Sequence, residues 1–116
     1  MQHIDKDRVQ AELDRRRGEP VWLHLETTTG SYTALGPEKR PPVIAFARNV
    51  QISYERGQIV GNGPYRVGLK LAQGWVYAEG LTDFELTERD ELLLAGHDHE
   101  GNLTVALQLS TVPFRE

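Results

Sequence analysis

The stretch GNGPYRVGLK, from Gly61 to Lys70, decides between two very different folds. Its glycines and basic residues suit a loop that holds a phosphate group, but they equally suit a turn that leads into a β-strand. A phosphate-binding P-loop needs Gly-x-x-x-x-Gly-Lys followed by Ser or Thr, and Leu69 stands where the lysine must be. Pro64 has no backbone N–H to offer an anion. The sequence therefore disfavours a phosphate loop here.

The residues after these glycines alternate between apolar and polar side chains, which is typical of a strand. Tyr65, Val67 and Leu69 would share one face, with Arg66 on the other. A phosphate loop also requires a helix after it, whose N-terminus holds the anion. We therefore predict a turn in which Gly61 or Gly63 takes a positive φ, followed by a strand.

The same alternation runs through most of the chain after Pro20. We predict a mainly β fold, a single domain over residues 1–116 that is β-rich over 21–110. Short strands separated by glycine-rich turns favour a β-sandwich or barrel of about eight strands. The predicted strands are VWLHLE (21–26), SYTAL (31–35), VIAFARN (43–49), VQISYER (50–56), YRVGLKL (65–71), WVYAEG (75–80), LLLAGHD (92–98) and LTVALQLS (103–110).

One N-terminal helix is predicted over about residues 6–17. Asp5 is a good N-cap, because its carboxylate can accept a hydrogen bond from an unpaired backbone N–H. Gly18 can end the helix in a left-handed turn. The arginines at 15–17 fit either an anion-binding patch or a solvated helix end, and the composition favours the solvated end.

Composition limits the classes of function. The chain has 116 residues, a net charge of −4 and no cysteine. A net acidic protein is not expected to have nucleic acid as its main partner. The absence of cysteine excludes disulfides and thiolate metal sites and fits a cytoplasmic location. The polar N-terminus does not resemble a signal peptide, and no apolar run is long enough to span a membrane.

Hydroxyl groups and arginines are the candidate ligand-binding residues. The hydroxyl-dense segment 27–32 can hydrogen-bond a sugar or carboxylate, although threonines also suit strands and turns. An arginine on a sheet can clamp a carboxylate or phosphate, or it can pair with a glutamate such as Glu55 or Glu79. The predicted ligand-binding set is Thr28, Thr29, Ser31, Tyr32, Arg48, Tyr65 and Arg66.

Three histidines are candidate metal ligands. His97 and His99 are two residues apart and would converge on one face of a strand, and His24 shares a face with Glu26 by the same rule. The alternative is that residues 97–102 form only a polar hairpin tip. The spacing of these residues specifies no third or fourth metal ligand. No cofactor is therefore predicted, and a divalent metal stays an open alternative.

The large aromatic residues are predicted to lie in the core or in a groove. Trp75 and Tyr77 would share one face of a strand, and Trp22 lies in another strand. As a stacking platform for nucleic acid, these aromatics lack basic neighbours along the sequence.

Four segments resemble the YojF family of small bacterial proteins: HLETTTGSY (24–32), GNGPYRVGLK (61–70), GWVYAEGLT (74–82) and LLLAGH (92–97). The resemblance implies a compact, mostly β domain. It also implies genomic company with a LmbE-like sugar deacetylase of the bacillithiol pathway, which makes that enzyme a candidate partner, but it supplies no catalytic residues. The family pattern shares His97 and lacks His99, which disfavours a role that needs both.

These observations leave three hypotheses. The leading one is a cytoplasmic, non-catalytic β domain that binds a small polar metabolite or a partner enzyme, either as a monomer or as a homodimer. The second, which rests on the resemblance alone, is an accessory subunit of the deacetylase. The third is a small metal-dependent enzyme that uses His97 and His99, with His24 as a further ligand.

Overall fold

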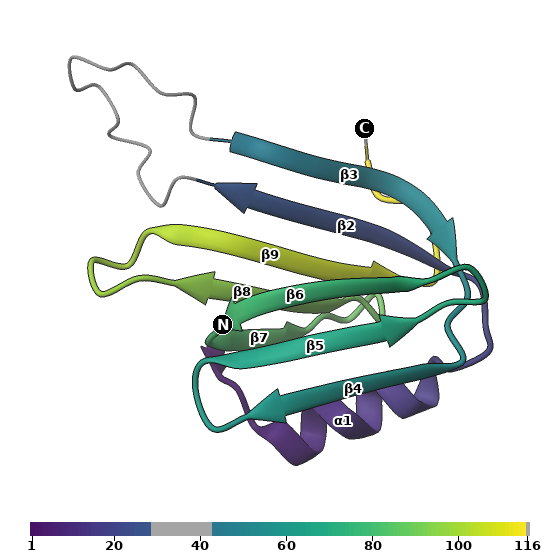
Figure 1. The fold of residues 1–116 in the computed structure, drawn as a ribbon, viewed down its shortest axis with the longest axis horizontal. Coiled ribbons are helices and arrows are strands. Elements are labelled where there is room, and N and C mark those ends of the chain that lie inside the picture. Colours follow the sequence, from purple (N-terminus) through teal and green to yellow (C-terminus); the bar gives the residue numbers. More distant parts are fainter. Residues whose placement is uncertain (29–42, 116) are drawn as a thin grey trace.

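Two β-sheets and one helix form the fold in the computed structural model, which describes residues 1–28 and 43–115 (Figure 1). The large sheet has the strand order β1-β7-β8-β9-β2-β3 and the small sheet the order β4-β5-β6, with antiparallel neighbours throughout. The elements are β1 (Gln2–His3), α1 (Lys6–Arg15), β2 (Val21–Thr28), β3 (Val43–Ile52), β4 (Arg56–Gly61), β5 (Tyr65–Lys70), β6 (Trp75–Leu81), β7 (Asp83–Leu86), β8 (Leu92–His97) and β9 (Leu103–Ser110).

The core lies between the two sheets. Strand β6 packs over β8 and β9, and α1 packs along β4, as Figure 1 shows. The inward side chains Leu69, Leu94 and Leu107 are fully buried. Each contributes roughly 1.5–3 kcal/mol of transfer free energy. The predicted β-sandwich with one N-terminal helix is therefore confirmed.

The segment at Gly61–Lys70 is a turn followed by a strand, as predicted. Gly61 and Gly63 have φ angles of 105° and 107°. β5 begins at Tyr65 and pairs with β4 and β6, so the chain after these glycines is extended and offers no helix N-terminus to an anion.

The close approach of the two sheets depends on one glycine. A Cβ atom placed on Gly96 of β8 would lie 2.2 Å from the backbone oxygen of Gly80 on β6. No side chain fits at that distance, so Gly96 allows the small sheet to lie directly against the large one.

The strand pattern differs from the prediction in β3. Two strands were expected over 43–49 and 50–56, but β3 runs unbroken from Val43 to Ile52. Asn49 is an extra residue there, because Leu23 pairs with Val50 while His24 pairs with Arg48. Its φ of 56° makes the bulge that interrupts the sequence alternation.

Nine strands occur among the described residues, and three short ones, β1, β4 and β7, were not predicted. β1 and β7 are two and four residues long, and β4 (RGQIVG) buries only Gly57 and Ile59, so each carries too little periodicity to be recognised. The strand predicted at 31–35 lies outside the described residues.

Helix α1 begins as predicted, with the Asp5 carboxylate accepting a hydrogen bond from the backbone N–H of Arg8 at 3.2 Å. It ends at Arg15, two residues earlier than predicted, and Gly18 follows with a φ of 80°. Within the part of the chain that the structure describes, no helix is long and apolar enough to cross a membrane.

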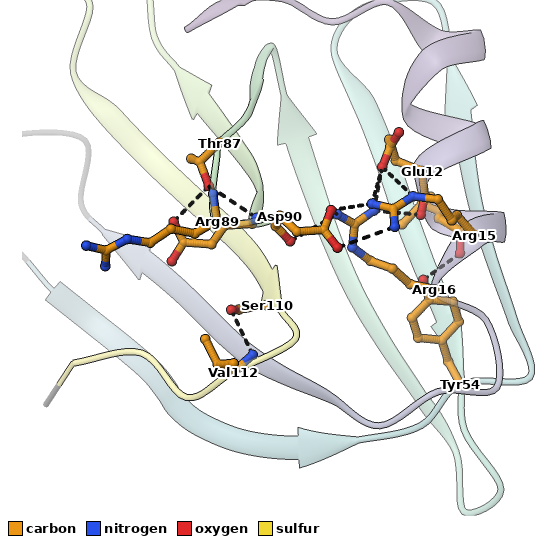
Figure 2. Close-up of polar contacts among 11 residues, drawn as sticks. Glu12, Arg15, Arg16, Tyr54, Thr87, Arg89, Asp90, Ser110 and Val112 are labelled. Atoms are coloured by element: carbon orange, nitrogen blue, oxygen red, sulfur yellow. Dashed lines mark hydrogen bonds and ion pairs between the residues drawn. The ribbon is translucent and has the colours of Figure 1, made fainter.

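The prediction of a solvated helix end is wrong for Arg16, which is only 2% exposed. Its guanidinium donates to the carboxylates of Glu12 at 2.7 Å and Asp90 at 2.9 Å, and to the Asp90 carbonyl at 3.1 Å (Figure 2). Arg15 joins the same two carboxylates from the solvent side. The hydrogen bond from Arg15 lowers the pKa of Asp90 more than partial burial raises it. This cluster ties α1 to the turn between β7 and β8.

Candidate functional site

An open cleft of about 620 Å³ lies where the small sheet stops short of covering the large one. Since β6 packs over β8 and β9, the inward face of β2 is only partly covered: Leu25 is half-buried and Thr27 is exposed. The volume falls in the range of small-molecule sites. The cleft is lined by Leu25 and Thr27 of β2, Arg66 of β5, Tyr77, Ala78 and Glu79 of β6, and Thr104 and Val105 of β9.

The charged groups of the cleft are Arg66 and Glu79, which form an ion pair at 2.5 Å. Both side chains are more than half exposed. An exposed pair of this kind stabilises the fold by only about 0–1 kcal/mol, so exchange of the Glu79 carboxylate for a ligand anion costs little. Arg66 keeps further N–H groups in a planar fork that matches a carboxylate or a phosphate.

Hydroxyl groups face this pair from the large sheet. Thr27 and Thr104 come from neighbouring strands, β2 and β9. The Thr104 hydroxyl donates to the carbonyl of Gly96 at 3.1 Å, which leaves its oxygen able to accept from a ligand. The cleft therefore combines a cation, an anion and hydroxyls above apolar side chains, a mixture suited to a small polar molecule.

The structure brings one predicted ligand-binding residue, Arg66, into this cleft and directs two others away from it. Tyr65 neighbours Arg66 on a strand, so its side chain points the opposite way and packs against the core. Thr28 is buried, and its hydroxyl donates to the backbone oxygen of Leu103 at 2.5 Å. Thr29, Ser31 and Tyr32 lie outside the described residues.

Arg48, the remaining predicted ligand-binding residue, contacts the chain itself. Its Nη1 lies 3.1 Å from Nδ1 of His24, and its Nε and Nη2 donate to the carbonyl of Arg115. Its guanidinium also stacks 5.1 Å from the ring centre of Phe114. Asn49 fixes the same C-terminal segment by donating to the Phe114 carbonyl at 2.8 Å and accepting from its N–H at 2.7 Å.

Both ring nitrogens of His24 have partners. Nε2 lies 3.0 Å from the Glu26 carboxylate, which confirms that these two side chains share a face. A guanidinium can only donate, so Nδ1 of His24 must accept from Arg48 and Nε2 must carry the proton. Neither nitrogen is then available to a metal ion.

His97 and His99 do not share a strand, so the strand geometry from which their convergence was predicted does not apply to them. β8 ends at His97, and His99 lies in the exposed turn that follows. Nδ1 of His97 is 2.7 Å from the carboxylate of Asp83, and His3 approaches the same carboxylate at 3.5 Å. Burial raises the pKa of Asp83, but hydrogen bonds from Thr82 and His97 outweigh it and hold the pKa below the usual value.

His24 also lies far from His97. His24 of β2 pairs with Gln108 of β9, and Gln108 pairs with Leu93 of β8, which lies four residues before His97. Strand spacing and rise then separate His24 from His97 by roughly 16 Å. Within residues 1–28 and 43–115, no group of three or more His, Cys, Asp or Glu side chains is placed to hold a metal ion.

Sequence reasoning did not select Thr27, Tyr77 or Thr104 as site residues, although all three line the cleft. Thr27 belongs to the hydroxyl-dense segment 27–32. Thr104 carries no local signal, and Tyr77 was predicted only to lie in the core or in a groove, because the packing of β6 beside β9 is what brings them together.

The comparisons with known proteins agree with this fold. Residues 3–114 match the family model described as a protein of unknown function, DUF1806. The uncharacterized protein YojF of Bacillus subtilis strain 168 is 52% identical over 114 residues, which cover 98% of each chain. The crystal structure of Bacillus subtilis YojF aligns with a TM-score of 0.85 and 46% identity, covering 99% of this chain and 97% of that one. The deacetylase partnership stays a prediction, since these descriptions name no partner. The predicted resemblance is confirmed, and the chain belongs to the DUF1806 family, which includes YojF.

Proposed function

We propose that this chain is a non-catalytic ligand-binding domain that holds a small polar molecule in the open cleft where the small sheet stops short of covering the large one. The observation that carries the proposal is the convergence of Arg66 and Glu79 from the small sheet with Thr27 from the large one. These groups come from strands far apart in sequence and meet around a space of suitable size.

The chemistry of the cleft favours a ligand with an acidic group and several hydroxyls. Arg66 offers a bidentate donor to a carboxylate or phosphate, while Glu79 and Thr27 can accept or donate to hydroxyls. Sugar phosphates, sugar acids and the sugars of the bacillithiol pathway have this combination. No histidine of the described chain lines the cleft, and the Glu79 carboxylate is held in an ion pair with Arg66, which supports binding over acid–base catalysis.

Thermal unfolding in the presence of these sugars tests the proposal. The parent protein is expected to gain several degrees of Tm with at least one of them at millimolar concentration, since binding to the native state stabilises it by mass action. Arg66→Ala and Thr27→Val should abolish the gain. Arg89→Ala and Thr111→Val remove the same groups from exposed positions outside the cleft and should retain it.

Two results would overturn the proposal. One is a parent protein whose Tm does not respond to any sugar of the panel. The other is a gain that survives in Arg66→Ala, because the ligand would then bind outside the cleft.

A further inference from the structure

Two large aromatic side chains lie on the solvent-facing side of the small sheet. Trp75 and Tyr77 are 43% and 50% exposed, so neither lies in the core; of the predicted alternatives, core or groove, Tyr77 fits the groove because it lines the cleft. Their rings are stacked, with centroids 5.4 Å apart and planes within 6° of each other. Exposed aromatic residues gathered in this way mark binding surfaces more often than single exposed apolar residues do.

Three cations surround these rings. The guanidinium carbons of Arg56 and Arg66 lie 5.6 Å from the ring centre of Trp75 and 5.4 Å from that of Tyr77. The Lys70 ammonium lies 5.9 Å from the Trp75 ring. The sequence-based view that these aromatics lack basic surroundings is therefore wrong. We call Arg56, Arg66, Lys70, Trp75 and Tyr77 the aromatic–cation surface.

Strand register explains why sequence reasoning missed this grouping. Arg56 of β4 pairs with Lys70 of β5, which pairs with Trp75 of β6, so residues from three strands form one row across the sheet. The next row on the same face contains Gly68 opposite Tyr77. A Cβ atom on Gly68 would lie 2.9 Å from the Tyr77 ring, so this glycine provides the space in which the ring lies.

We infer that the aromatic–cation surface binds a nucleotide unit, a planar base joined to a phosphate, either free or within a single strand. Exposed rings stack on any base, and basic side chains beside them attract the phosphate, which is the combination used by proteins that bind single strands. Neither feature alone requires this ligand, but an uncharged sugar would not use the three cations and a simple anion would not use the rings.

The acidic residues near the surface do not block it. Glu79 pairs with Arg66 and Glu55 approaches Lys70 at 3.6 Å, but both pairs are exposed and exchange readily with other anions. Among the described residues no carboxylate pairs with Arg56, whose guanidinium contacts Trp75 instead. The net charge of −4 predicts weak long-range attraction, so binding should depend on these short-range contacts.

The inference is separable from the proposed function. Arg66 and Tyr77 also line the cleft, but Arg56 and Trp75 do not. Variants at Arg56 and Trp75 therefore test the aromatic–cation surface alone, while loss of sugar binding in Thr27→Val tests the cleft alone.

The experiment measures fluorescence anisotropy of a labelled ten-thymidine DNA strand, with unlabelled thymidine monophosphate and inorganic tripolyphosphate as competitors. We expect the strand to bind, Trp75→Leu to weaken it about fivefold or more through lost stacking, and Arg56→Ala to weaken it about threefold or more. A plot of the logarithm of affinity against the logarithm of salt concentration should have a slope of about −2 for three phosphate contacts. In Arg56→Ala the magnitude of this slope should be smaller by about 0.7. Arg89→Ala is the matched control, because it removes the same charge from an exposed site whose side chain points away from the Arg16 cluster (Figure 2).

Each outcome decides the inference. If thymidine monophosphate displaces the labelled strand as effectively, per nucleotide, as the unlabelled strand does, free nucleotides are the ligand. If it displaces the labelled strand much less effectively, single strands are the ligand. Absence of binding by both overturns the inference. It is equally overturned if tripolyphosphate competes as well as the strand and folded Trp75→Leu binds normally, or if Arg89→Ala loses as much affinity as Arg56→Ala.

Discussion

Arg48 donates a hydrogen bond from Nη1 to Nδ1 of His24 at 3.1 Å, and this contact fixes the tautomer of a histidine that is only 7% exposed. We predict that His24 carries its proton on Nε2, where the Glu26 carboxylate accepts it. Long-range proton–nitrogen correlation NMR at neutral pH should show an unprotonated Nδ1. A proton on Nδ1 would contradict the geometry, because Arg48 cannot accept a hydrogen bond.

The control for this prediction is Arg48→Met, which keeps an unbranched side chain against Phe114 and removes the donor. The variant should lose roughly 1–3 kcal/mol of unfolding free energy, because it loses the hydrogen bonds to Arg115 as well as the one to His24. His24 should keep its proton on Nε2, where the Glu26 carboxylate still accepts it.

The His24 cluster also shows how far the sequence predicts the site. Strand alternation correctly placed His24 beside Glu26, because residues two apart on a strand share a face. The partnership with Arg48 was not predictable, since it depends on pairing between β2 and β3 and on the bulge at Asn49. Local periodicity determines which face a residue occupies, whereas strand order determines what lies beside it.

The same distinction applies to the fold and to the cleft. Alternating segments and glycine turns predicted a β-sandwich, but they could not predict that β6 would lie beside β9 and bring Arg66 close to Thr27. The burial of Arg16 was likewise missed, because the run at 15–17 looks uniformly solvated until the β7–β8 turn supplies Asp90.

Arg16 and Arg15 provide a second prediction, because they share the carboxylates of Glu12 and Asp90 at very different exposure (Figure 2). Arg16→Met should lower the free energy of unfolding by about 3 kcal/mol, since its buried guanidinium donates to both carboxylates and to two backbone oxygens, which then lose these donors. Arg15→Met should cost about 1 kcal/mol or less, because its side chain is half exposed. Urea unfolding of both variants measures the difference. Equal losses would mean that the buried position of Arg16 adds nothing.

Gly96 provides a third prediction. A Cβ atom there would overlap the Gly80 backbone oxygen, so Gly96→Ala must push the two sheets apart. We expect a loss of about 3 kcal/mol or more in unfolding free energy, the upper range for overpacking. Gly74→Ala is the matched control, because a Cβ there meets no atom within 4 Å, and it should change stability by less than about 0.5 kcal/mol. A Gly96→Ala protein as stable as the parent would contradict the described contact between β6 and β8.

The fourth prediction concerns acid stability and Asp83. Hydrogen bonds from Thr82 and His97 outweigh the effect of burial and hold the pKa of Asp83 below its usual value. A carboxyl whose pKa is lower in the folded state stabilises the protein above its unfolded pKa, about 3.9, and loses that contribution as pH falls through the folded pKa. Asp83→Asn should therefore be less stable than the parent at pH 7, and the two unfolding free energies should converge as pH is lowered from about 5 to 2.

Urea unfolding at intervals over this range measures the convergence. Thr82→Val should raise the pKa of Asp83 in a carboxyl NMR titration. Parent and Asp83→Asn curves that stay parallel down to pH 2 would show that the charge on Asp83 does not stabilise the fold.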